Sequence, residues 1–330
     1  MKLASLKRGG RDGALLVVDR ALTRAVAVPE IAPTLQAALD DWEHVCPTLE
    51  TVSKQLNASD VENAFPFDPG ELAAPLPRAF HWVDGSAYLD HMRRLRQARG
   101  APMPPDSDRV PLVYQGGSDR FLGPCDPIPL VDESWGLDFE AEVAVITGDV
   151  DQGSPAERVG ESIRLVMLVN DVSLRNLIPA ELAKGFGFYQ SKPASAFSPV
   201  AATPDELGDA WDGARVHLGL ESRVNDKLLG RPEAGEDMAF GFPDLIAHAA
   251  RTRVLGAGTI VGSGTVANHD PARGSSCIAE ARALETLDGG EPLTPYLRTG
   301  DRIRIEMVDR DGRSVFGAIE QEVIRSVTPD

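Results

Sequence analysis

Glycine and proline interrupt this chain so often that long helices and long strands have little room to form. The 330 residues include 31 glycines and 25 prolines, and beyond residue 75 these separate short runs of apolar and β-branched residues. Such runs are typical of strands joined by turns. They lie at 139–146, 216–224, 259–261 and 303–308. Helical patterns lie at 85–99, 155–169 and 240–253. Because these helices are too few to cover both faces of a parallel sheet, the sequence predicts a β-rich α+β fold.

The first 75 residues are organised differently and predict a small separate domain. Two apolar runs at 15–18 and 25–28 suit a hairpin. From Pro33 onward apolar residues recur at helical spacing, and this proline stands near the expected helix start, where its missing N–H costs little. Residues 66–77 carry four prolines, as a linker does. We therefore expect a small N-terminal domain at 1–75 and the main domain at 76–330.

Charge and cysteine content narrow the partners and the compartment. The formal charge of −17 at pH 7 argues against nucleic acid and anionic membranes, which are bound by basic surfaces. Cys46, Cys125 and Cys277 lie far apart, which fits a reducing cytoplasm better than disulfides or a zinc motif. No apolar segment of signal-peptide or membrane-spanning length occurs. We therefore expect a cytoplasmic protein that binds neither nucleic acid nor membranes.

The alternating segment 137–145 places two carboxylates on one face of a predicted strand. Residues two apart in a strand share a face at roughly 7 Å, so Glu140 and Glu142 can converge on one cation. Asp171 ends the next long apolar run, and carboxylate oxygens are the ligands that Mg²⁺ and Ca²⁺ take. From these residues alone two alternatives stay open: a solvated strand face for the glutamates, and a helix cap or turn for Asp171.

A histidine provides a candidate base. Asp84 and His91 stand seven residues apart in a predicted helix that ends near Arg99, so both can face one site two turns apart. Imidazole titrates near neutrality and suits the removal of a proton from water. Alternatively, Asp84 caps the helix and His91 is structural.

Three further segments are ambiguous by themselves. Lys192 stands in a polar turn, where lysines are usually exposed. Tyr114 precedes a pair of glycines and suits loop packing as well as substrate contact. The Gly/Ser-rich region 262–280 contains the hydroxyl of Thr265 and the carboxylate of Glu280.

Taken in order, these segments resemble the fumarylacetoacetase family, especially its shorter bacterial members, over most of residues 80–325. The family's metal-binding Glu-x-Glu corresponds to Glu140 and Glu142. Its Asn-Asp-x-Ser-x-Arg motif corresponds to 170–175 and its Ser-Gly-Thr strand end to 263–265.

The resemblance extends to single residues. The family's first metal aspartate and its catalytic histidine stand seven residues apart, as Asp84 and His91 do, and its lysine and glutamate partners match Lys192 and Glu280. The implied metal ligands for Mg²⁺ or Ca²⁺ are Asp84, Glu140, Glu142 and Asp171. The implied catalytic residues are His91, Glu280 and Lys192, and the implied substrate contacts are Arg99, Tyr114, Arg175 and Thr265. The resemblance also implies a mixed β-sandwich or roll catalytic domain and a homodimer.

Some positions depart from the family. Arg99 is a displaced match to its substrate-binding arginine, and Ser86 stands where longer members have a tyrosine. Ile178 and Leu182 replace a glutamine and a second tyrosine. These departures concern the substrate more than the metal.

The function implied by the resemblance is hydrolysis of a carbon–carbon bond in a β-diketo acid. The expected substrate is fumarylacetoacetate, cleaved to fumarate and acetoacetate in tyrosine and homogentisate catabolism. Alternatives on the same fold are acylpyruvate hydrolase, oxaloacetate decarboxylase, isomerase and sugar-acid dehydratase activities, all of which use metal-stabilised enolates. A ligand-binding or scaffold protein without catalysis is an alternative of another class.

Overall fold

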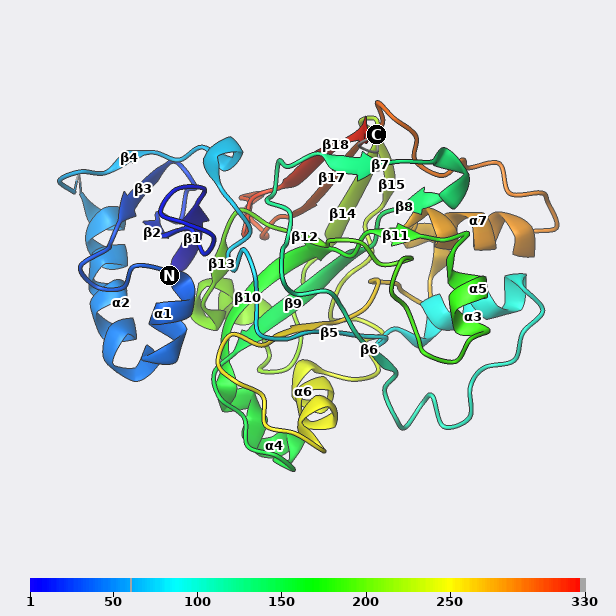
Figure 1. The fold of residues 1–330 in the computed structure, drawn as a ribbon, viewed down its shortest axis with the longest axis horizontal. Coiled ribbons are helices and arrows are strands. Elements are labelled where there is room, and N and C mark those ends of the chain that lie inside the picture. The colour runs from blue at the N-terminus through cyan, green and yellow to red at the C-terminus, as the bar shows by residue number, and fades with distance from the viewer. Residues whose placement is uncertain (60, 327–330) are drawn as a thin grey trace.

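Short strands joined by turns dominate the structure (Figure 1). The computed structural model describes residues 1–59 and 61–326. Its strands are β1 Lys2–Leu6, β2 Ala14–Val18, β3 Arg24–Ala27, β4 Phe65–Pro66, β5 Trp82–Gly85, β6 Val113–Gln115, β7 Ile128–Leu130, β8 Leu137–Asp138, β9 Ala141–Thr147, β10 Ile163–Asn170, β11 Ser173–Leu174, β12 Ala196–Phe197, β13 Ala201–Ala202, β14 Leu220–Val224, β15 Lys227–Gly230, β16 Ile260–Gly262, β17 Arg302–Met307 and β18 Ile319–Arg325. Its α-helices are α1 Leu35–Asp40, α2 Trp42–Ala58, α3 Leu89–Ala98, α4 Ala156–Val159, α5 Ile178–Leu182, α6 Phe242–Ala250 and α7 Ile278–Leu287.

One large mixed sheet joins the N-terminal strands to the central strands. Its strand order is β4-β3-β2-β1-β13-β10-β9-β16-β5-β6, and β12 pairs beside β10. Neighbours are antiparallel except β5 and β16, which are parallel. The N-terminal hairpin joins the sheet where Lys2 pairs with Ala202, so the blue segment in Figure 1 continues the central strands. The boundary expected near residue 75 stays a prediction.

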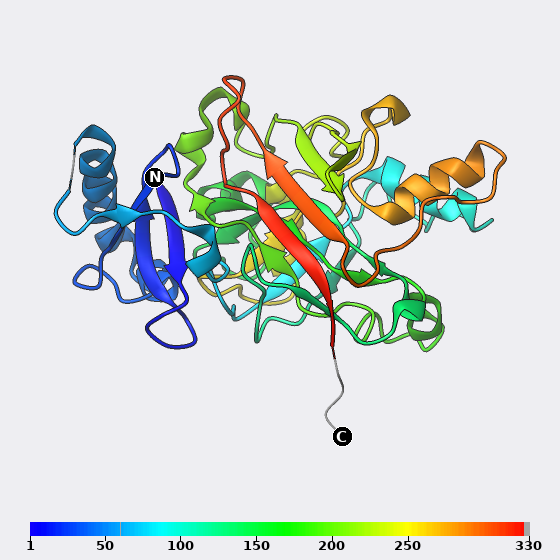
Figure 2. The same ribbon diagram turned by 90° about the horizontal axis from the view of Figure 1, so that it is seen from above.

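A second, five-stranded sheet covers one face of the central strands. Its order is β15-β14-β17-β18-β7, and Figure 2 shows its orange and red strands, β17 and β18, lying over the middle of the molecule. Val143 and Val166 of the large sheet share an apolar core with Ile305 and Val323 of the second sheet. The two packed sheets confirm the β-rich, sandwich-like α+β fold expected from the sequence.

The opposite face of the central strands packs against the N-terminal segment. Ile146 and Met167 lie in a second apolar cluster together with Leu39 and Leu49 of the first two helices. Strand β9 is therefore buried on both faces, and the alternative of a solvated strand face for the Glu-x-Glu segment is wrong.

Three helix predictions are corrected by the structure. In the predicted helix 155–169, α4 and a 3-10 turn at Gly160–Ser162 are helical, and β10 begins at Ile163, because a continuous apolar run buried on both faces suits a strand as well as a helix. The helix expected after Pro33 is broken into α1 and α2 at Asp41. Asp84 lies in strand β5, and α3 begins only at Leu89. Asp84 and His91 therefore do not share a helix face, contrary to the prediction.

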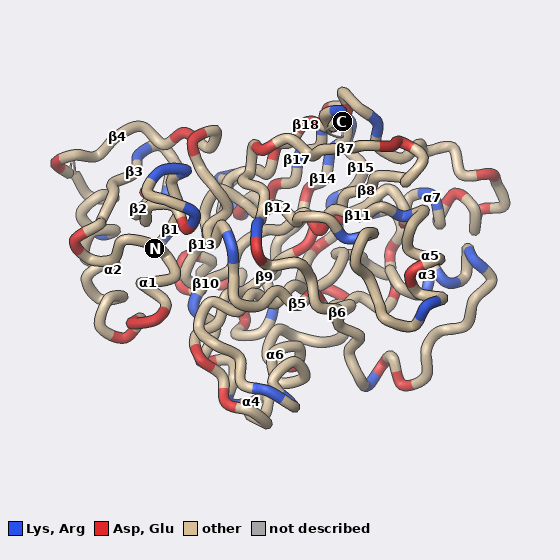
Figure 3. The backbone as a smooth tube through the Cα atoms, in the orientation of Figure 1, with Lys and Arg blue, Asp and Glu red and all other residues tan. Residues whose placement is uncertain are grey.

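Neither charge nor apolarity is concentrated in one segment. Figure 3 shows Asp and Glu from the N-terminal helices to the C-terminal strands, with Lys and Arg between them. Within residues 1–59 and 61–326, no helix combines the length and apolarity needed to cross a membrane. Buried polar residues therefore point to a functional site more clearly than the surface does.

Candidate active site

Neighbouring strands bring three carboxylates to one edge of the large sheet. Asp84 lies in β5, Glu142 lies in β9, and Asp171 directly follows β10. Strand β16 runs between β5 and β9, and there Gly262 pairs with Asp84. A Cβ atom at Gly262 would lie 2.3 Å from Asp84 Oδ1, so only glycine fits. One carboxylate oxygen from each of the three acids lies within 4.8 Å of the others.

This carboxylate cluster, Asp84, Glu142 and Asp171, carries more negative charge than its surroundings compensate. The three side chains belong to residues that are 5%, 0% and 0% exposed. Burial and then repulsion from neighbouring carboxylates raise the pKa of Asp84 and of Glu142 well above the ordinary range. Neither oxygen of Glu142 accepts a hydrogen bond from a donor group of the described residues, and the Asp84 carboxyl lies close enough to share a proton with it. Because a buried carboxylate without a partner is costly and oxygen ligands suit hard cations, these residues fit a divalent metal ion.

Asp171 is bound by three side chains of the chain itself. The Tyr114 hydroxyl donates to both carboxylate oxygens at 2.8 Å, Ser195 Oγ donates to Oδ1 at 2.9 Å, and Lys192 Nζ donates to Oδ2 at 2.6 Å. Burial and the charge of Asp171 raise the pKa of Tyr114, so this residue stays a neutral donor. Sequence reasoning found Tyr114 and Lys192 but missed Ser195, which stands three residues after the lysine.

Glu140 is tied to two cationic side chains. Lys192 Nζ donates to Oε2 at 2.6 Å and Arg175 Nη2 donates to Oε1 at 2.8 Å. Burial alone would raise the pKa of Glu140, but Arg175, Lys192 and His91 hold it well below the usual range. The structure thus brings three of the four predicted metal ligands together and leaves Glu140 outside the cluster. The Lys192 ammonium joins Glu140 to Asp171.

Arg175 also connects the site to the start of a helix. Its Nε donates to Asp138 Oδ2 at 2.8 Å, and the Asp138 carboxylate accepts the backbone N–H groups of Ile278 and Ala279 at 2.8 and 2.9 Å. Asp138 therefore holds the N-terminus of α7 beside Arg175. Sequence reasoning missed this aspartate, although it opens the same alternating segment as the two glutamates.

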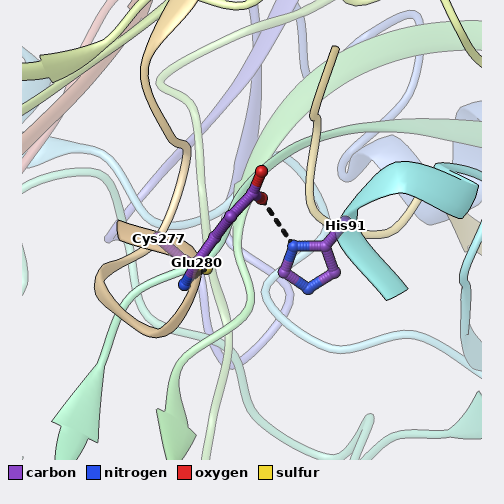
Figure 4. Close-up of side chains that lie close together, drawn as sticks. All are labelled: His91, Cys277 and Glu280. Atoms are coloured by element: carbon purple, nitrogen blue, oxygen red, sulfur yellow. Dashed lines mark hydrogen bonds and ion pairs between the residues drawn. The ribbon is translucent and has the colours of Figure 1, made fainter. Parts of the chain in front are cut away.

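His91 and Glu280 meet although 189 residues separate them (Figure 4). His91 Nδ1 lies 2.7 Å from Glu280 Oε2, and Arg94 Nη1 donates to Oε1. Arg94 Nη2 also donates to the backbone oxygens of Asn268 and His269 at 2.7 and 2.8 Å. A proton on Nδ1 that is donated to the carboxylate leaves Nε2 as the basic nitrogen. Arg94 was missed, although its i+3 position on α3 puts it beside His91.

The family models match most of the chain. "Fumarylacetoacetate (FAA) hydrolase C-terminal" matches residues 81–324, and "Fumarylacetoacetase N-terminal domain 2" matches residues 1–78. The chain belongs to the fumarylacetoacetate hydrolase family. The family resemblance seen in the sequence motifs is therefore confirmed.

Individual members of this family differ in the activity for which they are named. Oxaloacetate tautomerase YisK of Bacillus subtilis is 25% identical over 240 residues, 71% of this chain and 69% of that protein. Fumarylacetoacetate hydrolase of Exiguobacterium antarcticum superposes with a TM-score of 0.68 at 19% identity, covering 99% of this chain and 100% of that one. Maleylpyruvate hydrolase of Sphingobium sp. SYK-6, solved with manganese(II) ion and pyruvate, gives 0.64 at 18% identity with the same coverage. At identities this low, the structural similarity establishes the fold alone.

The Ser-Gly-Thr segment of this fumarylacetoacetate hydrolase family member supports Asp84. The Gly264 N–H donates to Asp84 Oδ1 at 3.1 Å, and Ser263 Oγ accepts the Val143 N–H at 3.3 Å. Gly264 has φ +79°, and a Cβ atom there would lie 2.5 Å from a backbone oxygen. Thr265 follows directly and is buried.

Arg99 stands apart from the other predicted residues. It lies exposed at the C-terminal end of α3, and its guanidinium has no hydrogen bond or ion pair within the described part of the chain. Desolvation by surrounding protein atoms and repulsion from Arg175 lower the pKa of Arg99. An unpaired guanidinium in this position is free to bind a carboxylate.

A cavity of about 310 Å³ reaches this site. Tyr114 and Lys192 line it together with the segments around Arg120 and Phe188. A larger cavity of about 450 Å³, lined by Lys2 and by residues of 205–210 and 309–315, contains none of the predicted site residues. The smaller cavity is therefore connected to the site through Tyr114 and Lys192, which both bind Asp171.

Proposed function

We propose that this protein is a metal-dependent hydrolase that cleaves a carbon–carbon bond in a β-diketo acid, with fumarylacetoacetate as the first substrate to test. The observation that carries the proposal is the combination of a carboxylate cluster whose negative charge is only partly compensated with His91, whose Nδ1 faces Glu280. A metal site and a base for water are the two requirements of this reaction. A homodimer, a cytoplasmic location and tyrosine catabolism are the expectations that accompany it.

The carboxylate cluster would hold the cation, with Glu140 as the fourth ligand expected from the sequence. Bound there, Mg²⁺ or Ca²⁺ would supply Lewis acidity toward the two oxygens of the β-diketo group. The manganese ion in the Sphingobium maleylpyruvate hydrolase supports a divalent cation in this fold. The unpartnered oxygens of Glu142 support it from this chain's own residues.

His91 would activate the water. Its Nε2 takes a proton while Nδ1–H donates to Glu280, which stabilises the imidazolium that forms. Arg94 holds the second oxygen of Glu280 and so fixes the orientation of the pair. The hydroxide formed in this way adds to the acyl carbonyl carbon, and the carbonyl π electrons move to its oxygen.

Lys192 would stabilise that oxyanion. Burial alone would lower its pKa, but Asp171 and Glu140 raise it, so Lys192 stays an ammonium. Two of its three N–H groups are used by Glu140 and Asp171, and the third can reach a substrate oxygen. The carbon–carbon bond then breaks, its electron pair forms the enolate of the leaving ketone, and His91 returns the proton.

Arg99, Tyr114 and Thr265 are our proposed substrate contacts. Arg175 is proposed on the same ground, but its Nε and Nη2 already bind Asp138 and Glu140. The Nε–H and one Nη2–H of Arg175 are thus committed to the protein's own carboxylates, so its main contribution is to position Glu140.

Oxaloacetate tautomerisation is the second candidate. Relatives with that name support it. Ser86, Ile178 and Leu182 replace polar or aromatic residues of the longer family members, so the substrate need not be that of the longer enzymes. Tautomerisation moves a proton between carbon and oxygen and adds no water. It would use His91 as the base but would leave every carbon–carbon bond intact.

One assay separates these candidates. Fumarylacetoacetate, acetylpyruvate and oxaloacetate are each followed by loss of enol absorbance, with Mg²⁺ and after chelation, and the products are identified. Metal-dependent cleavage of fumarylacetoacetate that His91→Ala abolishes is the expected result. Cleavage of acetylpyruvate alone would transfer the function to acylpyruvate hydrolysis. Conversion of oxaloacetate without new products would favour the tautomerase, and no turnover of any substrate would refute both.

A further inference from the structure

Cys277 lies beside His91 and Glu280 and has no part in the proposed reaction. Its Sγ, a ring nitrogen of His91 and a carboxylate oxygen of Glu280 all lie within 4.8 Å of one another (Figure 4). The three residues are 0%, 7% and 0% exposed. This group, the His–Cys–Glu cluster, offers nitrogen, sulfur and oxygen, whereas the carboxylate cluster offers oxygen alone.

The position of Cys277 does not require a sulfur atom. It is the N-cap of α7, and its Sγ accepts the Glu280 N–H at 3.3 Å. Serine and threonine are the preferred hydroxyl residues at N-caps, so a serine would serve the helix at least as well. Burial raises the pKa of the Cys277 thiol, and the sulfur is therefore inert unless a cation displaces its proton.

We propose that His91, Cys277 and Glu280 form a second metal site, selective for a borderline-soft divalent cation such as Zn²⁺. Thiolate, imidazole and carboxylate are the ligands that zinc takes, and thiolate discriminates against Mg²⁺ and Ca²⁺. Ligand atoms around tetrahedral zinc are roughly 3.5 Å apart, so His91 Nδ1 and Glu280 Oε2, which lie 2.7 Å apart, need to separate by on the order of 1 Å to admit the cation. Water would complete the coordination.

The proton balance of binding is explicit. The thiol releases its proton to solvent, and the imidazole moves its proton from Nδ1, which faces Glu280, to Nε2. Glu280 Oε2 turns from the imidazole to the cation, while Arg94 keeps Oε1. His91 then presents N–H instead of a lone pair at Nε2, so zinc would inhibit water activation. This inhibition rests on the proposed function, whereas the metal site itself does not.

Cadmium tests the site without turnover. Cd²⁺ bound to a thiolate absorbs in the ultraviolet, which Cd²⁺ on oxygen ligands does not, and excess Mg²⁺ occupies the carboxylate cluster. Cys46 is partly exposed and Cys125 exposed, so a Cys46→Ser/Cys125→Ser double variant removes their signal. We expect one equivalent of cadmium–thiolate absorption in the double variant and its loss when Cys277→Ser is added.

Absorption that is missing from the double variant overturns the proposal, because Cys277 is then the one cysteine left in the sequence. Far-ultraviolet circular dichroism checks that Cys277→Ser keeps the fold, as the N-cap preference for serine predicts. If that variant does not fold, His91→Ala in the double-variant background decides. It should weaken cadmium binding at least about tenfold, since even the loss of a group that only orients a metal ligand commonly has that effect. Unchanged binding would exclude His91 as a ligand and refute the site.

Discussion

The carboxylate cluster and the His91–Glu280–Arg94 group are both buried, yet they balance their charge in opposite ways. Both oxygens of Glu280 are engaged, one by His91 and one by Arg94. Both oxygens of Glu142 have no partner among the described residues. A buried carboxylate with its counter-charge built in holds neighbouring groups in place. A buried carboxylate without one is arranged for a ligand, and that contrast can be tested residue by residue.

The largest effect is expected at the carboxylate cluster, where the unpartnered oxygens of Glu142 predict a bound cation. Glu142→Gln should lower metal-dependent turnover by at least about a thousandfold, because Lewis acidity is worth several kcal/mol of transition-state stabilisation. Isothermal titration with Mg²⁺ should show binding lost in parallel. The control is Glu157→Gln, the same change at an exposed glutamate in α4, which should match wild type. Full Mg²⁺ affinity in Glu142→Gln would remove the carboxylate cluster as the metal site.

His91→Ala should separate base from metal. We expect kcat/KM to fall by about a hundredfold to a thousandfold, the range for losing a general base, with Mg²⁺ affinity retained. His44→Ala, at an exposed histidine of α2, is the control for the substitution itself. Equal loss of metal affinity would mean that the two groups are one site, and the distinction drawn above would be wrong.

Arg94→Met tests whether the counter-charge of Glu280 is structural. Removing Arg94 leaves Oε1 of the buried Glu280 carboxylate without its cationic partner, so the free energy of unfolding should fall by about 3 kcal/mol in urea titrations. The neighbouring Arg93 pairs with Asp90 and is much more exposed, so Arg93→Met should change stability by less than about 0.5 kcal/mol. If the two variants lose similar amounts of unfolding free energy, the ion pair between Arg94 and Glu280 does not hold the His91–Glu280–Arg94 group together.

The two regions also differ in how far the sequence predicts them. Alternation in 137–145 predicts a buried strand with Glu142 on it, since strand period is a local property, whereas Glu140 stands just before β9 and pairs with Lys192 and Arg175. The approach of His91 to Glu280 is a contact between α3 and α7 that no local pattern encodes, and it was expected only from the family resemblance. Asp84 was placed on the wrong element because capping residues and strand ends share the same residue types. Arg94 and Ser195 were missed because their role depends on the partner that the fold brings to them.

Metal-free stability gives the smallest and most specific test. Because burial and neighbouring carboxylates raise the pKa of Asp84 and Glu142, the folded chain keeps protons there that the unfolded chain releases. The free energy of unfolding should therefore fall as the pH rises above the ordinary carboxyl range. The amide of Glu142→Gln cannot ionise, so the folded state no longer has to hold a proton at this position, and the amide can donate to Asp84. In EDTA at pH 7 this variant should be more stable than wild type, by on the order of 1 kcal/mol.

Magnesium should reverse that order, since only wild type gains free energy from binding the ion in the folded state. Urea unfolding of both proteins at pH 5 and pH 7, with EDTA and with Mg²⁺, measures how the free energy of unfolding depends on pH and on the metal. If Glu142→Gln is the less stable protein in EDTA at pH 7, Glu142 is already compensated in the free chain. The two buried groups would then balance their charge in the same way, and the unpartnered oxygens of Glu142 would no longer indicate a ligand site.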